Sequence, residues 1–304
     1  MSASLSAAQW RQVGMLTAVA GVLLAGVALF RSRPDFTHMD FVAGGPGSLE
    51  FCDPANPRFL PVVARSSPVV AELRTSAPAV AGGPVAAVLV LRTNTGKPIG
   101  PRDLRPTGAE KMSLLVVDPK LVDFQALRPN PGSRPGEWLF AFTPRGSGTY
   151  RIFADFTPEA TGQEMYASVD LAVAGRRIAD STVESARGST AGRASWRMVL
   201  HPSVAPIRAR EPVDLDFAVA RLDGSAPALQ PVDGFPARLV AFDQNRTGFV
   251  NLRPEPASAS AADGKRDIFT FKVTIPDPGN YVIWSRISDR GTEVDTPFPL
   301  EVVP

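Results

Sequence analysis

Beyond about residue 68, hydrophobic and polar positions alternate in short stretches that are rich in β-branched and aromatic residues. Alternation with a period of two predicts half-buried β-strands, and no stretch in this region shows the period of an amphipathic helix. The strands expected in the first half are 69–75, 85–92, 111–117, 138–143, 149–156 and 165–173, and those in the second half are 196–200, 213–221, 237–242, 268–275, 280–288 and 296–303.

The second series of strands repeats the first. Residues 114–131 align without a gap with residues 239–256, which lie 125 positions later, and seven of the eighteen pairs are identical. Ala77-Pro78 recurs as Ala205-Pro206, and the Gly-x-Tyr that ends at Tyr150 recurs at Tyr281. An internal repeat of this length predicts two domains of one fold.

Several short strands with turn residues between them are typical of immunoglobulin-like sandwiches. We therefore expect an all-β chain with two tandem immunoglobulin-like β-sandwich domains, residues 69–174 and 196–304, joined by a polar linker at 175–195. The Gly-x-Tyr before a late strand predicts a tyrosine corner, in which a buried ring packs while its hydroxyl bonds nearby backbone.

One segment has the length and polarity of a membrane span. Residues 13–30 carry no charge and are flanked by Arg11, Arg31 and Arg33. The stretch is longer than the core of most signal peptides, which favours a retained transmembrane anchor over a cleaved signal. Residues 1–12 are then a short tail, residues 31–68 a Pro/Gly-rich juxtamembrane stalk, and the rest of the chain is expected outside the cytoplasm, in the periplasm or at the cell surface.

Composition narrows the classes of function. The 32 basic and 30 acidic residues are scattered and give a net charge of +2, so the sequence has no basic footprint for nucleic acid. Two histidines and one cysteine offer little for acid–base or metal chemistry, and one cysteine forms no disulfide within the chain. We expect no cofactor and no enzymatic activity.

The segment 114–131, followed by Trp138 to Pro158, resembles the YtkA-like family of extracytoplasmic β-sandwich domains, which is often associated with metal-handling envelope proteins. The resemblance covers about residues 85–174 and, more weakly, 213–303. It implies a sandwich fold and, through the family's Phe-x-His-x-His-Pro turn, a pair of imidazoles able to chelate a transition metal.

Here the two histidine positions of that turn are replaced. Ala126 and Arg128 stand there in the first copy, and Asn251 and Arg253 in the second. Neither alanine nor a permanently protonated guanidinium ligates a metal, so the resemblance implies the fold without the metal site. Arg128 and Arg253 remain candidates for contact with a ligand or partner, and the alternative is a local structural pairing, for example with Asp118 or Asp243 of the same copy.

Other candidate residues lie mostly before the repeats. Cys52 is a candidate for an intermolecular disulfide that would make a homodimer, or else a buried inert thiol. Together with His38 and Met39 it is also the weak alternative for a metal site. Within the first copy, the carboxylates of Asp118 and Asp123 are expected to accept backbone amides in a turn.

The sequence thus favours a non-enzymatic, membrane-anchored envelope protein that presents two β-sandwich domains to a protein partner. The alternative is a metal- or small-ligand-handling accessory protein of the envelope. An enzyme would need a pocket with converging titratable groups, which a sequence does not reveal.

Overall fold

The computed structural model describes residues 68–106, 110–176, 189–193, 195–255 and 264–304. In these residues the chain is all-β, and the one helical element is a single 3₁₀ turn at Pro101–Asp103. No described helix has the length and apolar character needed to cross a membrane. The expected anchor at 13–30 lies outside the described residues.

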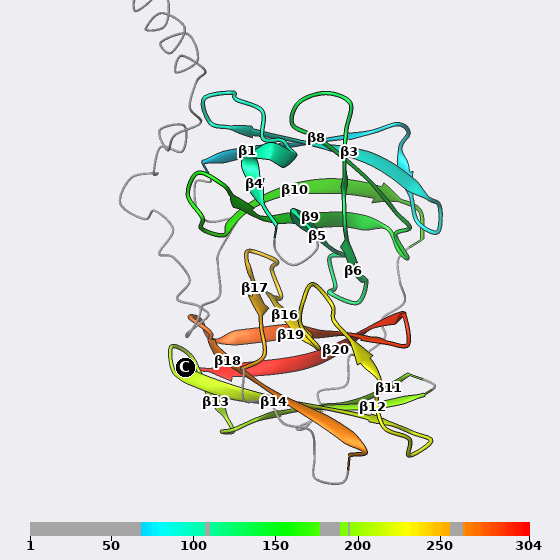
Figure 1. Cartoon of the computed structure of the whole chain (residues 1–304), viewed down its shortest axis with the longest axis vertical. Coiled ribbons are helices and arrows are strands. Elements are labelled where there is room, and N and C mark those ends of the chain that lie inside the picture. Colours follow the sequence, from blue (N-terminus) through cyan, green and yellow to red (C-terminus); the bar gives the residue numbers. More distant parts are fainter. Residues whose placement is uncertain (1–67, 107–109, 177–188, 194, 256–263) are drawn as a thin grey trace, which may run out of the picture. The chain divides into compact units, whose positions relative to one another are not determined.

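The described residues of the first half form ten strands, most of them in two sheets. The sheet orders are β1-β3-β8-β7 and β2-β10-β9-β5-β6, and β4 pairs with β9. In Figure 1 these sheets lie as two layers. The strands are β1 Val69–Thr75, β2 Ala79–Val80, β3 Val85–Thr93, β4 Leu104–Arg105, β5 Met112–Val117, β6 Phe124–Leu127, β7 Asn130–Pro131, β8 Glu137–Phe142, β9 Gly148–Pro158 and β10 Met165–Ala174.

The second half has the same architecture. Its sheets run β11-β12-β14-β18 and β13-β20-β19-β16-β17, and β15 pairs with β19. The strands are β11 Ser189–Arg193, β12 Trp196–Pro202, β13 Ile207–Arg208, β14 Pro212–Arg221, β15 Leu229–Gln230, β16 Arg238–Asp243, β17 Phe249–Leu252, β18 Arg266–Thr274, β19 Gly279–Asp289 and β20 Thr292–Val303.

The strand order of the larger sheet is the same in the two halves, as the sequence repeat predicts, and the smaller sheets share the order β1-β3-β8 and β12-β14-β18 but differ at their edges, where β7 and β11 are added. Each half has a short strand, β2 or β13, that pairs in parallel with the last strand of that half in sequence, β10 or β20. All the other named strand pairs are antiparallel.

Each half closes its two sheets over a separate core. In the first half, Leu89 of β3 and Trp138 of β8 pack against Leu114 of β5 and Ile152 of β9. In the second half, Phe217 of β14 and Phe271 of β18 belong to a core that also includes residues of the facing sheet. Both halves are therefore β-sandwiches, and both belong to one compact unit.

The tyrosine corner predicted for each copy is confirmed. The backbone N–H of Gly146 donates to the hydroxyl of Tyr150 at 3.2 Å, and the hydroxyl of Tyr281 donates to the carbonyl of Asp277 at 2.9 Å. In both copies the partner lies four residues before the tyrosine. Burial raises the pKa of both phenols, that of Tyr281 to about 12, so both stay protonated and act as structural groups.

The structure differs from the expected linker at 175–195. Ser189–Arg193 forms β11, which pairs antiparallel with β12 from Arg193↔Trp196 to Ser189↔Leu200. A stretch of small residues with a glycine has low strand propensity, and the neighbouring strand overrides it here by supplying a ladder. The short strands β6 and β17 were also not among the expected strands. They extend each larger sheet by one strand at its edge.

Candidate functional site

A third hydrophobic cluster, separate from the two sandwich cores, joins the two halves. We call it the seam. Its aromatic rings interlock: the centroid of Phe153 lies 5.0 Å from that of Phe249, and Phe124 lies 5.3 Å from Trp284. The buried members are Leu115, Val117, Leu121, Phe124, Phe153 and Tyr166 of the first half and Val240, Phe242, Phe249 and Trp284 of the second.

The seam is built from the same surface of both copies. Leu115, Val117 and Phe124 lie 125 positions before their counterparts Val240, Phe242 and Phe249, and all six residues belong to the seam. In each copy they come from the two strands at the end of the larger sheet, β5 and β6 or β16 and β17. The two sandwiches therefore pack as an isologous pair does, with one surface meeting its own duplicate.

Arg128 and Arg253 form reciprocal ion pairs at this seam. Both terminal nitrogens of Arg128 donate to Glu293 Oε1 at 3.0 Å, and Nη2 also donates to Asp233 at 3.2 Å. In the opposite direction, Arg253 pairs with Glu164 of the first half. Glu164 and Glu293 hold equivalent positions, because Val173↔Gly148 in one copy corresponds to Val302↔Gly279 in the other.

Neither arginine pairs with Asp118 or Asp243 of its own copy, because those carboxylates are taken up by turn backbone. Each arginine side chain is about two-fifths exposed, at 39% for Arg128 and 40% for Arg253. Pairs this exposed contribute about 0–1 kcal/mol each, so their reciprocity fixes orientation more than it adds stability. Contact with an external ligand or partner through these arginines stays a prediction.

A partly buried chain of polar side chains crosses the seam beside these pairs. Arg238 Nε donates to Asn251 Oδ1 at 3.2 Å, and Asn251 Nδ2 donates to Asp155 Oδ2 at 2.9 Å. Burial and the negative charge of Glu164 raise the pKa of Asp155 to about 7, and Asn251, Arg238 and Arg253 oppose that rise. Asp155 is therefore the described carboxyl group whose charge changes near neutral pH.

Two donors in the seam region lack a partner among the described residues: Nη1 of Arg238 and Nε1 of Trp284. Burial also lowers the pKa of Arg238. Unmet buried donors are costly, so the polar part of the seam is less well satisfied than its aromatic part.

Two aspartates hold equivalent turns, as expected for Asp118. Asp118 Oδ1 accepts the backbone N–H of Val122 at 2.7 Å and of Asp123 at 2.8 Å. In the second copy Asp243 Oδ1 accepts from Thr247 at 2.7 Å and Gly248 at 2.9 Å. The turns share a left-handed residue, Leu121 with φ 57° and Arg246 with φ 54°.

Asp123 also has the predicted structural role. It is buried and accepts the hydroxyl of Tyr150 at 2.7 Å and the backbone N–H of Arg145 at 2.8 Å. A carboxylate with these fixed partners ties the turn to the tyrosine corner. Turn chemistry is therefore confirmed for both aspartates.

Replacing Asp243 by alanine removes the acceptor for three backbone amides of its turn, those of Asn245, Thr247 and Gly248. We expect the free energy of unfolding to fall by about 2 kcal/mol, and Asp118→Ala to cost about the same. Urea denaturation of the full chain measures both. Glu72→Ala, which removes an exposed pair with Arg74, serves as a control expected to stay within about 0.5 kcal/mol. Equal midpoints for the Asp243 variant and this control would contradict the structural role.

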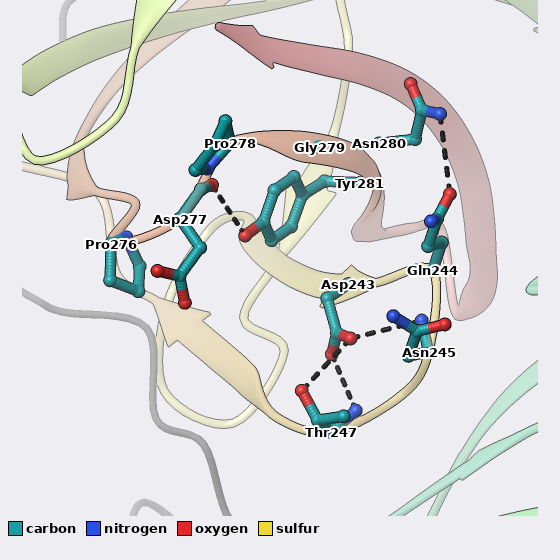
Figure 2. Close-up of a pocket in the computed structure, with 10 residues that line it drawn as sticks. All are labelled: Asp243, Gln244, Asn245, Thr247, Pro276, Asp277, Pro278, Gly279, Asn280 and Tyr281. Atoms are coloured by element: carbon teal, nitrogen blue, oxygen red, sulfur yellow. Dashed lines mark hydrogen bonds between the residues drawn. The ribbon is translucent and has the colours of Figure 1, made fainter. Parts of the chain in front are cut away.

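A small pocket of about 170 Å³ opens beside the Asp243 turn. Figure 2 shows its lining, which comes from the end of β16 and the turn after it and from the start of β19 and the turn before it. The Tyr281 hydroxyl is directed at Asp277, and the Asp243 carboxylate is turned into its own turn. In the first copy the ring of Pro119 occupies the corresponding place, and a Cβ on Gly148 would lie 2.7 Å from it. Gln244 replaces that proline, and a Cβ on Gly279 would meet nothing within 4 Å.

The pocket is smaller than the usual range for small-molecule sites, about 300–1,000 Å³. Its best acceptor, Asp243, already accepts three backbone amides and the Thr247 hydroxyl. The pocket therefore follows from the presence of Gln244 in the second copy where the first copy has Pro119, and we assign no ligand to it.

The remaining sequence candidates fall elsewhere. Cys52, His38 and Met39 lie outside the described residues. Ala126 is partly buried against the seam, and Asn251 of the second half donates a hydrogen bond across it to Asp155 of the first half. Glu164, Glu293 and Asp155 were not among the candidates. Among the described residues, no three His, Cys, Asp or Glu side chains gather as metal ligands would.

Comparison with known proteins gives a family match for part of the chain. Residues 197–303, the second sandwich, match the family model of a domain of unknown function, DUF8832. No curated protein matches the chain.

Solved structures give remote likenesses. A DUF4785 family protein from Legionella pneumophila shares 12% identity with a TM-score of 0.25, over 78% of this chain and 57% of that one. The native α2-macroglobulin of E. coli shares 12% with a TM-score of 0.26, over 78% and 17%. A Salmonella α2-macroglobulin mutant shares 14% with a TM-score of 0.23, over 78% and 16%. The chain thus spans little more than half of the first of these proteins and about a sixth of the others.

Proposed function

We propose that this chain is a non-enzymatic cell-envelope protein that presents two immunoglobulin-like β-sandwich domains for contact with another protein. Residues 13–30 would anchor it in the membrane, with the sandwiches outside the cytoplasm. The fold would be that of the YtkA-like family, which the sequence resembles, without that family's metal-binding turn.

The observation that carries this proposal is the seam. Its aromatic side chains, among them Phe153, Phe249 and Trp284, are almost fully buried between the sandwiches. A buried contact between two domains restrains their relative motion, and a restrained pair offers a partner a preorganised surface at lower entropic cost. The two sandwich domains expected from the sequence would then act as one composite module.

The replaced turn of the YtkA-like family supports the same proposal. Asn251 and Arg253 stand at the histidine positions of that turn, and both contact residues of the first sandwich, Asp155 and Glu164. Ala126 and Arg128, which stand at the same positions in the first sandwich, also lie at the seam. Positions that would ligate a metal in the family are here used to join two domains.

Cross-linking in the native membrane, followed by binding of the purified neighbour to the full chain in detergent, tests the proposal. We expect one protein neighbour that binds saturably, and a purified chain without stoichiometric metal. The opposite result is copper or zinc at one equivalent per chain that is lost in the Cys52→Ala variant. That result would replace the proposal with the metal-handling alternative.

A further inference from the structure

The seam changes character along β9. Side chains alternate along a strand, so Arg151, Phe153 and Asp155 all lie on the face that meets the second sandwich. Phe153 belongs to the aromatic middle of the seam. Arg151 and Asp155 stand on either side of it, about 13 Å apart at about 3.3 Å per residue, and each makes its own polar contact with the second sandwich.

The Arg151 end of the seam is held by groups that do not titrate near neutral pH. Arg151 Nη1 donates to the carbonyl of Arg246 at 2.8 Å, and Arg246 Nη1 donates to the carbonyl of Thr149 at 2.6 Å. Arg151 also pairs with Asp170, and the hydrogen bond from Arg151 lowers the pKa of that carboxyl group. Because a guanidinium keeps its proton in proteins, the contacts at this end stay the same between pH 5 and 8.

The Asp155 end depends on one carboxyl group. Asp155 accepts Nδ2 of Asn251 at 2.9 Å, so the group that holds it across the seam is a neutral amide. Arg238 donates from Nε to the same asparagine. Arg253 pairs with Glu164. In the described part of the chain neither arginine forms an ion pair with Asp155, so deprotonation places a charge at the interface opposite an amide rather than a cation.

The neighbours of Asp155 within its own sandwich add no positive charge. Across its sheet Asp155 lies opposite Ser113 of β5 and Tyr166 of β10. The Tyr166 hydroxyl donates to Glu164 at 2.8 Å, so this side brings a second carboxylate. Burial and then the charge of Glu164 raise the pKa of Asp155 to about 7, whereas Asn251 and the two arginines oppose that rise.

Parting of the sandwiches would remove the cover that the second sandwich gives to Asp155. Water then reaches this carboxyl group and screens Glu164, and the pKa of Asp155 returns toward its ordinary value, near 4. The closed seam therefore holds a proton that the open seam releases. Closure is favoured in acid, and this advantage is lost as pH rises through about 7.

The same part of the seam has other groups that gain from opening. Nη1 of Arg238 and Nε1 of Trp284 lack a partner among the described residues. Both residues lie on the seam face of their sheet, since Val240 is paired with Trp284 and Arg238 stands two positions before Val240 on β16. Unmet buried donors are costly, and access to water lowers that cost.

We propose that the Asp155 end of the seam is a pH-dependent joint between the two sandwiches. Below neutral pH it holds them together, and above neutral pH they part more often at this end while both stay folded. The Arg151 end, whose contacts do not titrate in this range, is the side about which they part. This inference goes beyond the proposed function and does not rest on it.

Thiol trapping of the full chain in detergent measures the opening. Two variants in a Cys52→Ala background each carry one thiol on β16: Val240→Cys faces the seam, and Ala241→Cys faces the core of the second sandwich. The labelling rate of each thiol by a methanethiosulfonate reagent, divided by its rate in the urea-unfolded chain at the same pH, gives an opening constant. We expect this constant to be at least about tenfold larger at position 240 than at position 241, because the seam opens without unfolding of a sandwich.

Between pH 5 and 8 we expect the opening constant at position 240 to rise by about thirtyfold, and the added change Asp155→Asn should abolish the rise. Asp170→Asn, at the Arg151 end, is the matched control and should keep it. Equal constants at positions 240 and 241 would mean that the seam opens only when a sandwich unfolds. A constant that does not change with pH, or a rise that survives Asp155→Asn, would show that Asp155 does not control the opening.

Each of these three results overturns the proposal. The first two come from chains that keep Asp155, so they decide the matter even if the Asp155→Asn variant does not fold. A free energy of unfolding that depends on pH, together with an opening constant that does not, would mean that the first sandwich alone perturbs Asp155.

Discussion

Replacing Phe249 by alanine is expected to lower the free energy of unfolding by about 3–5 kcal/mol and to split the unfolding of the chain into two transitions. Phe249 is fully buried in the seam, with ring centroids 5.0 Å from Phe153, 4.8 Å from Tyr166 and 6.1 Å from Phe242. Removing its ring leaves a cavity at the centre of the contact between the sandwiches. Neither sandwich core loses a residue.

Urea denaturation followed by tryptophan fluorescence and far-ultraviolet circular dichroism measures both effects. Trp284 lies in the seam, whereas Trp138 and Trp196 lie in the sandwich cores. Loosening of the seam before the sheets unfold would therefore make the two signals diverge, which is the mark of a transition that is no longer two-state.

Phe271→Ala is the matched control. Phe271 is also fully buried, but it belongs to the core of the second sandwich. Its loss should lower stability by a similar amount while the intact seam still couples the sandwiches and the two signals coincide. Coincident signals in both variants would show that the seam adds no coupling between the domains.

The sequence contained an indication of the seam that the alternation of apolar and polar residues does not reveal. In β5 and β16 the buried residues do not alternate: Leu114 to Val117 and Arg238 to Asp243 are buried on both faces. A strand with both faces buried needs cover on both sides. The unbroken apolar stretch that ends at Val117 was therefore compatible with a second contact, but it does not say which surface provides the cover.

The strands and the repeat were predictable because they rest on local patterns. The ion pairs of the seam were not, since Arg128 and Glu293 are 165 positions apart and meet only once both sheets are formed. The repeat relates Glu164 to Glu293 only through the register of β10 on β9 and of β20 on β19. β11 was missed for the opposite reason, because its residues favour a linker and the neighbouring strand makes it a strand.

Duplication explains why the candidate arginines are paired as they are. When a surface packs against its own duplicate, each cross-contact occurs twice, and Arg128–Glu293 with Arg253–Glu164 is such a set. The copies then diverged: Asp155 of β9 has Arg286 as its counterpart in β19. Arg286 is buried among Asp233, Glu293 and Asp295, and so reinforces the network that holds Arg128. Asp155 is therefore an acidic residue at the seam whose counterpart in the second half, Arg286, is basic.

The stability of the protein is expected to fall as pH rises from 5 to 8, and the Asp155→Asn variant should lose most of that slope. Burial and the nearby charge of Glu164 raise the pKa of Asp155 to about 7 in the folded protein. Between its ordinary pKa, near 4, and 7, the folded state holds a proton that the unfolded chain releases. The stabilising contribution is therefore full at low pH and is lost as pH rises through about 7.

Because one pKa unit corresponds to about 1.4 kcal/mol, we expect a loss on the order of 2 kcal/mol between pH 5 and pH 8. Asparagine keeps an acceptor for Asn251 Nδ2 but does not titrate, so urea midpoints of the variant should change little over this range. Asp170→Asn is the control. The hydrogen bond from Arg151 lowers the pKa of Asp170, so its contribution is lost only as pH falls below about 4. This control must therefore keep the slope between pH 5 and 8, and a flat profile in the unmodified protein would contradict a titrating acid at the seam.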